Sequence, residues 1–211
     1  MTLRLEQISH PQIIAALKTF VPSPIRSFVR RRNVESEKVA LATARSTDRK
    51  LLNETLLPAL SRGAGRALWV GCRAYTARYP TIIEACGAEC WTTDIDPVAA
   101  RHGRPGRHVT GDAKQIDALF AGMEFGTVFL NGVFGFGIDD VAGQDECIEG
   151  ISRILKPGGL LLVGWNHDAV QDPERLPAMQ KSFVRAAVPG CETRVRYDDV
   201  THVYDVFRRA G

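Results

Sequence analysis

The sequence predicts an α/β protein with a doubly wound, mostly parallel seven-stranded sheet, and three features of the chain carry this prediction. From Arg66 onward, short apolar runs alternate with helix-like segments, as in parallel strands joined by helical crossovers. The first run ends in Gly71, and the second ends in a carboxylate, Asp94. Ligands of open α/β sheets bind outside the carboxyl ends of the strands, so these two residues mark a candidate site.

The apolar runs give the expected strands in order. We place them near 66–71, 89–94, 107–111, 126–131 and 159–165, followed by 192–197 and 201–208. Helical segments are expected near 79–86, 97–101, 114–121, 143–155 and 174–187. Pro80 suits only the first turn of a helix, so the first of these helices should begin at Arg78 or Tyr79. The last two strands are close enough in sequence to pair antiparallel, which makes the sheet mixed.

Residues 1–62 differ in character and are expected to form a helical N-terminal cap or lid ahead of a cofactor-binding α/β domain over residues 63–211. Pro11 can open one helix, and the run from Asp48 to Leu60 predicts another, with Asp48 as its N-cap. This segment either closes over a substrate pocket or packs over one sheet edge. The run Arg30–Arg32 either binds an anionic substrate or forms a solvated helix face.

Composition narrows the class of protein. A chain of 211 residues that is 45% hydrophobic and 24% charged fits one soluble globular domain with a small appendage. A net charge of +3 without a concentrated basic face disfavours nucleic acid as a partner. The five cysteines include no Cys-x-x-Cys pair, so a reduced protein without a metal site is expected. No signal peptide and no spanning apolar stretch is visible, which predicts a cytoplasmic protein.

Five segments in sequence order resemble the class I methyltransferases, which use S-adenosyl-L-methionine and have a Rossmann-like sheet. The segments are Leu68–Gly71, Thr93–Pro97, Val109–Ala113, Phe129–Val133 and Leu155–Val163. The resemblance extends over roughly Arg66 to Arg209, and it rests on the order and spacing of the segments. It implies S-adenosyl-L-methionine as the cofactor and methyl transfer as the reaction.

The resemblance also implies a set of cofactor-binding residues at the strand ends. Asp94 would bind the ribose hydroxyls, Asp112 the adenine amino group, and Ala113 would offer its backbone amide. Each aspartate has an alternative role as a helix or turn cap, the role that we expect for Asp96 ahead of Pro97. The remaining implied positions are Gly71, Cys72, Arg73, Ile95, Asn131 and Gly132.

The loop after the first strand departs from the family pattern. The family has acid-x-Gly-x-Gly-x-Gly, whereas the corresponding positions here are Trp69, Gly71, Arg73 and Tyr75. Two side chains therefore stand where close backbone approach is usual. We expect Arg73, Tyr75 or Thr76 to replace the lost contacts, for example by pairing the guanidinium with the cofactor's carboxylate. The alternative is a pocket that no longer binds this cofactor.

Two features bear on the chemistry. His167, just past the fifth strand, is the best candidate for a general base, because imidazole titrates near neutral pH. A surface histidine without a role is the alternative, and His202 is expected to be a packed or exposed strand histidine. The loop Gly132–Gly137 either walls a substrate pocket through Phe134 or Phe136 or is a structural turn with core phenylalanines.

These observations predict methyl transfer to an oxygen or nitrogen of a small-molecule acceptor, because the chain has modest charge and no added recognition domain. Two alternatives remain. One is an RNA or protein methyltransferase that uses the arginine segments, and the other is a cofactor-binding or interaction protein of this fold without catalysis. No metal or membrane partner is expected, and a homodimer is compatible with the sequence. The acceptor itself stays open.

Overall fold

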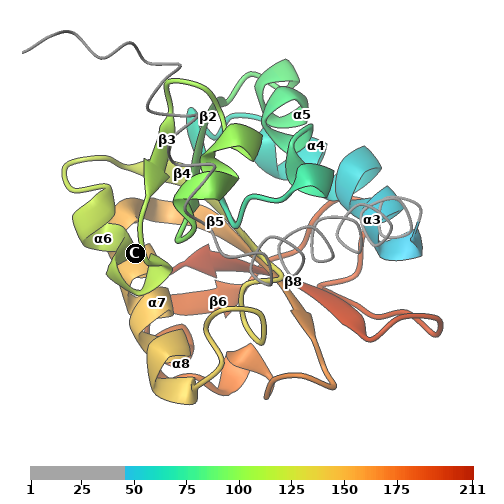
Figure 1. Ribbon diagram of the computed structural model, residues 1–211. Coiled ribbons are helices and arrows are strands. Elements are labelled where there is room, and N and C mark those ends of the chain that lie inside the picture. The colour runs from blue at the N-terminus through green and yellow to red at the C-terminus, as the bar shows by residue number, and fades with distance from the viewer. Residues whose placement is uncertain (1–45) are drawn as a thin grey trace, which may run out of the picture. The chain divides into compact units, whose positions relative to one another are not determined.

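The computed structural model describes residues 46–211 (Figure 1). The helix expected at Pro11 and the arginine run Arg30–Arg32 lie outside the described residues. The division into a cap of residues 1–62 and a domain of residues 63–211 stays a prediction. None of the described helices is long and apolar enough to cross a membrane.

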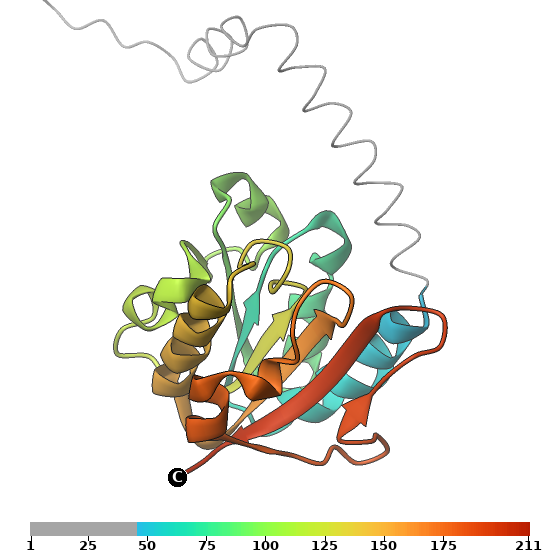
Figure 2. The same cartoon turned by 90° about the horizontal axis from the view of Figure 1, so that it is seen from below.

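The centre of the fold is a mixed sheet with strand order β3-β2-β1-β4-β5-β8-β6. The strands are β1 (Arg66–Val70), β2 (Glu89–Asp94), β3 (His108–Thr110), β4 (Phe125–Asn131), β5 (Leu155–Asn166), β6 (Phe183–Arg185), β7 (Arg194–Val195) and β8 (His202–Arg209). Strands β1 to β5 are parallel, and β8 is the long antiparallel strand beside β5 (Figure 2). The predicted mostly parallel sheet is confirmed, with the short β7 added on β8.

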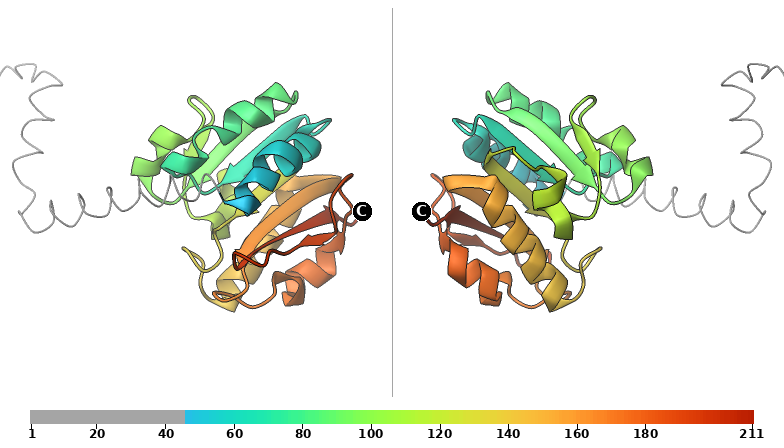
Figure 3. Two further views of the ribbon diagram at one scale, coloured as in Figure 1. Left: turned by 90° about the vertical axis from the view of Figure 1, so that its right-hand side faces the viewer. Right: turned by 90° about the vertical axis from the view of Figure 1, so that its left-hand side faces the viewer.

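Helices cover both faces of the sheet, as the prediction of a doubly wound fold requires. One face carries α3 (Thr47–Leu51), a π-helical turn (Leu52–Leu56), α4 (Leu57–Ser61) and α5 (Tyr79–Ala85). The other carries α6 (Ile116–Leu119), α7 (Val141–Ile154) and α8 (Pro177–Ser182). Figure 3 shows α7 over one face and the α3–α4 segment over the opposite face.

Each face of the sheet has its own hydrophobic core, because parallel strands are buried on both sides. Leu68 and Val70 of β1 pack towards α7, where they join Ile148 and Ile151. The alternate residues of the strands face the other way, and Trp69 packs in the core formed by the leucines of α3 and α4. The alternation fixes which strand-end side chains face each helical layer.

The helix predicted for residues 48–60 is present, but its N-cap is Ser46 rather than Asp48. The prediction for Asp48 was wrong because the N-cap lies two residues earlier and the helix begins at Thr47, so Asp48 lies in its first turn. The π-helical turn precedes Pro58, which has no N–H to donate and crowds the carbonyl four residues before it.

Three further expectations need correction or refinement. The helix predicted for residues 174–187 is wrong beyond Ser182, because Phe183–Arg185 forms β6 on the edge of β8. The segment before α8 is only a 3-10 turn, Pro173–Arg175. The crossovers at Pro97–His102 and Ala113–Gln115 are also 3-10 turns. The helix at Pro80 begins at Tyr79, as predicted.

The register of the parallel strands brings the predicted site residues to one edge. Val70 pairs with Thr93 of β2 and with Leu130 of β4, and Asn131 pairs with Gly164 of β5. Consequently Asp94, Gly71 and Asn131 follow one another in this order across the carboxyl edge of the sheet, where ligands of open α/β sheets bind.

Candidate functional site

Asp94 is the best-connected residue at this edge. Its side chain is buried at the end of β2, with 5% of the residue exposed. One carboxylate oxygen, Oδ2, accepts hydrogen bonds from the Cys72 amide at 2.7 Å and from Arg73 Nη1 at 2.8 Å. The other, Oδ1, accepts from the Asp96 amide at 2.8 Å. The structure thus brings together three predicted site residues, Cys72, Arg73 and Asp94, and the carboxylate ties the loop after β1 to β2.

The loop after β1 keeps its shape without the second and third glycines of the family pattern. Gly71 has φ +89°, a conformation that favours glycine. The next residues form a short 3-10 turn, Ala74–Thr76. The Thr76 hydroxyl accepts from the Arg73 amide at 2.9 Å and donates to the Arg73 carbonyl at 3.0 Å. A side-chain hydroxyl therefore closes this loop and holds its backbone.

Trp69 takes the position of the family's acid, and it is a core residue. Its indole N–H donates to the Gly71 carbonyl, which braces the start of the loop. Its ring packs edge-on against Tyr79 at 4.7 Å and stacks with Phe129 at 6.0 Å. This position consequently brings no charge to the site.

The Cys72 thiol has no role as a nucleophile. Burial, followed by the negative charge of Asp94, raises its pKa to about 12, so the thiol stays protonated at neutral pH. Its sulfur lies 3.7 Å from the Thr93 carbonyl and donates to it. Within residues 46–211, no group of three or more His, Cys, Asp or Glu side chains is placed to hold a metal ion.

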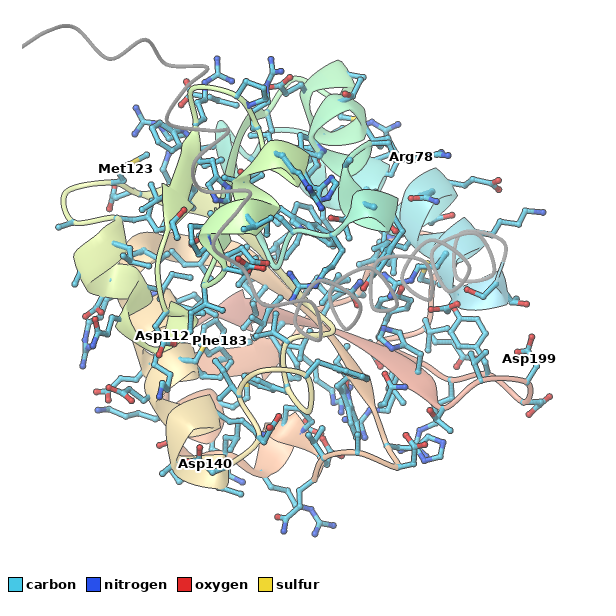
Figure 4. The ribbon with its side chains drawn as sticks, viewed as in Figure 1. Arg78, Asp112, Met123, Asp140, Phe183 and Asp199 are labelled. Carbon is cyan, nitrogen blue, oxygen red and sulfur yellow. The ribbon has the colours of Figure 1, made fainter. Side chains whose placement is uncertain are left out.

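The ends of β2 and β3 combine capping with exposed surface. Asp112 accepts from the Lys114 amide at 3.0 Å and Asp96 from the Val98 amide at 2.9 Å, so both cap 3-10 turns. Ala113 is buried, whereas Ile95 is 62% exposed beside Asp94. Figure 4 shows Asp112 on the same side of the described fold as Asp140, which caps α7. Asp112 therefore acts as a turn cap, the alternative role that the sequence analysis gave it. Its carboxylate also remains partly exposed to solvent.

At the end of β4, Asn131 belongs to a buried polar chain. Its Oδ1 lies 2.9 Å from Nε2 of His202, and Nδ1 of His202 lies 2.8 Å from Oδ1 of Asn166. These hydrogen-bonded side chains cross β5 at Gly164, where an added Cβ atom would lie only 1.8 Å from Asn131 Oδ1. Gly132, which follows Asn131, has φ +65° and open space around it. His202 is a packed strand histidine, and no sequence pattern indicated its link to Asn131.

Two further side chains continue this polar chain. Asn166 donates its side-chain N–H to the Thr201 hydroxyl at 2.9 Å, and its oxygen faces Nδ1 of His202. Burial, and then the positive charge of Arg49, lower the pKa of His202 to about 4. The ring is therefore neutral at neutral pH.

The side-chain amide of Asn131 is the buried polar group at the carboxyl end of β4. Its oxygen faces Nε2 of His202, and its NH₂ group has no hydrogen-bond partner among the described residues.

His167 lies exposed just beyond β5 and lines an open cavity of about 570 Å³. Its ring makes no hydrogen bond with any residue of the described range, so Asp168 does not orient it. The cavity is also lined by Trp165, Asp168, Asp172, Arg175 and Arg196. Asp172 is engaged in a bidentate pair with Arg194, at 2.6 and 2.8 Å.

The two phenylalanines of the loop after β4 differ in burial, so only one of them is a core residue. Phe134 is buried in the core beneath α7, whereas Phe136 is exposed. A Cβ on Gly135 would lie 3.1 Å from Ala169 and from Val170, so this loop packs against the loop that follows β5. The loop therefore connects the Asn131 end of the site with the loop that carries His167.

No family model and no curated protein matches the sequence. Solved structures do match. A TehB-like SAM-dependent methyltransferase from Corynebacterium glutamicum is 19% identical, with a TM-score of 0.56 over 84% of this chain and 99% of that one. The N-methyltransferase NodS from Bradyrhizobium japonicum WM9, crystallised with S-adenosyl-L-homocysteine, is 16% identical, with a TM-score of 0.53 over 83% and 99%. The chain has the class I methyltransferase fold.

Proposed function

We propose that this protein transfers a methyl group from S-adenosylmethionine to an oxygen or nitrogen of a small-molecule acceptor. The observation that carries the proposal is the buried Asp94 carboxylate, bonded to the loop after β1 at the carboxyl edge of the sheet. The likeness of the fold to NodS, which was crystallised with S-adenosyl-L-homocysteine, supports the same cofactor.

The residues at this edge suit an adenosine-type ligand. Asp94 offers a carboxylate of the kind that accepts hydrogen bonds from ribose hydroxyls. Ile95 and Val98, both exposed, provide apolar surface beside it for a planar ring. Asp112 and the backbone of Ala113 lie at the end of the next strand for polar contacts with the base.

Arg73 has to move for this ligand to bind. A carboxylate has about four lone-pair sites, and three of those on Asp94 already accept hydrogen bonds. Two ribose hydroxyls need two sites, so the guanidinium must give up its place. Arg73 can do so because its side chain is 48% exposed.

For the reaction, the bound cofactor supplies an electrophilic methyl group on a sulfonium. Methyl transfer is an in-line displacement, so the main task of the chain is to position the acceptor. His167, which lines the cavity beyond the aromatic loop, would remove a proton from the acceptor.

The test uses S-adenosylmethionine with a labelled methyl group and a panel of small amines, phenols and carboxylates, with structured RNA as a comparison. The expected result is label in a small-molecule product and one equivalent of S-adenosylhomocysteine. Asp94→Asn should abolish the transfer, while His167→Ala should lower kcat more than it changes KM. Tight cofactor binding without transfer to any acceptor would favour the non-catalytic alternative, and transfer to RNA alone would contradict a small-molecule acceptor.

A further inference from the structure

Helix α3 carries two adjacent charged residues that are both buried. Asp48 is 4% exposed and Arg49 is 7% exposed. Their closest atoms, Arg49 Nε and Asp48 Oδ2, are 3.5 Å apart. Among the described residues, Oδ1 of Asp48 and both Nε and Nη1 of Arg49 have no hydrogen-bond partner.

Such an arrangement is costly for a purely structural element. A buried charge is stable only when it is paired and its donors and acceptors are satisfied. A leucine or methionine at either position would pack without that cost. Buried polar atoms without partners therefore call for an explanation, and a bound ligand is one of the standard ones.

The position of the pair points to the site. The segment from α3 to α4 ends at Ser61, close to the amino end of β1 at Arg66. The other end of this segment, α3, therefore lies near the carboxyl edge of the sheet. Thr47 accordingly donates a hydrogen bond of 3.0 Å to Asp199, in the loop before β8. Figure 1 shows α3 beside the start of β8.

Neighbours of the pair belong to the site already described. The guanidinium carbon of Arg49 is 5.4 Å from the ring centroid of Tyr75, in the loop after β1. Both charges also act on the pKa of His202, which holds Asn131, after the larger effect of burial. Arg49 therefore lies beside the loop after β1. The half-buried Tyr75 ring is the group that a ligand would stack on or displace.

The loop after β1 offers one cation for a carboxylate, Arg73, once its guanidinium leaves Asp94. Trp69 is neutral and packed in the core. The hypothesis that Arg73 pairs with the cofactor's carboxylate therefore has an alternative in α3. There an anionic and a cationic side chain are adjacent, and both have polar atoms without hydrogen-bond partners among the described residues.

We infer that Asp48 and Arg49 form a binding site for the zwitterionic end of an α-amino acid group. The free N–H groups of Arg49 would donate hydrogen bonds to its carboxylate, and the free oxygen of Asp48 would accept from its ammonium group. The group is either the methionine end of the cofactor or an amino-acid acceptor. The first case rests on the proposed function.

Two ligands separate these cases by calorimetric titration. S-adenosylhomocysteine carries the amino acid group, and 5′-methylthioadenosine has the same adenosine and thioether without it. For Arg49→Met and Asp48→Asn we expect S-adenosylhomocysteine to bind on the order of 30-fold more weakly, with the affinity for methylthioadenosine unchanged. The matched control is Arg62→Met, which removes an exposed arginine just past α4.

A second arm tests the acceptor. The free common amino acids are titrated into the protein saturated with S-adenosylhomocysteine. Loss of amino-acid binding in Arg49→Met, with S-adenosylhomocysteine unaffected, assigns the pair to an amino-acid acceptor. Unchanged affinities in both arms overturn the inference. Circular dichroism checks that each variant is folded. If Arg49→Met does not fold, Arg49→Lys replaces it, because lysine keeps the positive charge without the guanidinium.

The two proposals fail in different ways. Wild-type protein that is folded but binds neither S-adenosylhomocysteine nor methylthioadenosine contradicts the proposed function itself. Wild-type protein that binds both ligands, with variants that bind them equally well, contradicts only the role of Asp48 and Arg49.

Discussion

Arg73 donates a hydrogen bond of 2.8 Å to the carboxylate of Asp94, from a position where the family pattern has glycine. The same guanidinium nitrogen also donates to the Cys72 carbonyl at 2.7 Å, which folds the side chain back over its own loop. The Arg73 guanidinium thus covers the Asp94 carboxylate, which we propose as the ribose-binding group. Arg73 would therefore compete with the ribose contact that we propose for Asp94.

Arg73→Ala should therefore strengthen the binding of S-adenosylhomocysteine. A half-exposed ion pair contributes about 0.2–1 kcal/mol, so its removal should lower the dissociation constant by a factor of roughly 1.4 to 5. Calorimetry measures this directly, with Arg78→Ala as the control because Arg78 is an exposed arginine of the same loop region (Figure 4). Weaker binding by Arg73→Ala would mean that the guanidinium leaves Asp94 to contact the cofactor, as the sequence first suggested.

His202 should make the stability of the protein depend on pH. Its pKa is about 4 in the folded protein against 6.5 ordinarily, because burial and then Arg49 disfavour the imidazolium. The unfolded chain thus binds the extra proton first, and stability should fall as the pH drops from about 6.5 to about 4, by about 3 kcal/mol over the whole window. Urea unfolding of wild type and His202→Gln, which cannot titrate, checks this. Parallel pH profiles for the two proteins would contradict the buried neutral imidazole.

Gly164→Ala should break the polar chain at the end of β4. The added Cβ would lie 1.8 Å from Asn131 Oδ1 and 2.9 Å from His202 Nε2, so one of the two side chains must move. We expect a loss of about 2 kcal/mol in the free energy of unfolding, in the range for overpacked sites. The matched control is Gly137→Ala, where a Cβ would meet nothing within 4 Å. Equal stabilities of the two variants would show that Gly164 has no such role.

The elements that the sequence predicted well have strong local signals. The run Ala67–Val70 is continuously apolar and ends in glycine, and Asp96 before Pro97 indicates the turn that the structure contains. Pro80 correctly located the start of α5. In each case neighbouring residues alone determine the local structure, so the sequence is sufficient.

What the sequence did not predict depends on distant partners. Phe183–Arg185 follows α8 without a turn signal and becomes a strand because β8 offers an edge to pair with. The bond between His202 and Asn131 joins residues 71 positions apart on strands that β5 separates. The pairing of Arg73 with Asp94 likewise needs the register of β1 and β2, which no periodicity reveals.

The most direct test of the central claim is the affinity of the purified protein for S-adenosylhomocysteine, measured by calorimetry for wild type, Asp94→Asn and the control Asp117→Asn. Asp117 is a carboxylate on α6, paired with Arg153 away from the loop after β1. We predict micromolar binding by wild type and by the control, and an affinity on the order of 30-fold lower or undetectable for Asp94→Asn. Equal binding by Asp94→Asn, or no binding by folded wild type, would contradict the cofactor site proposed at the carboxyl end of β2.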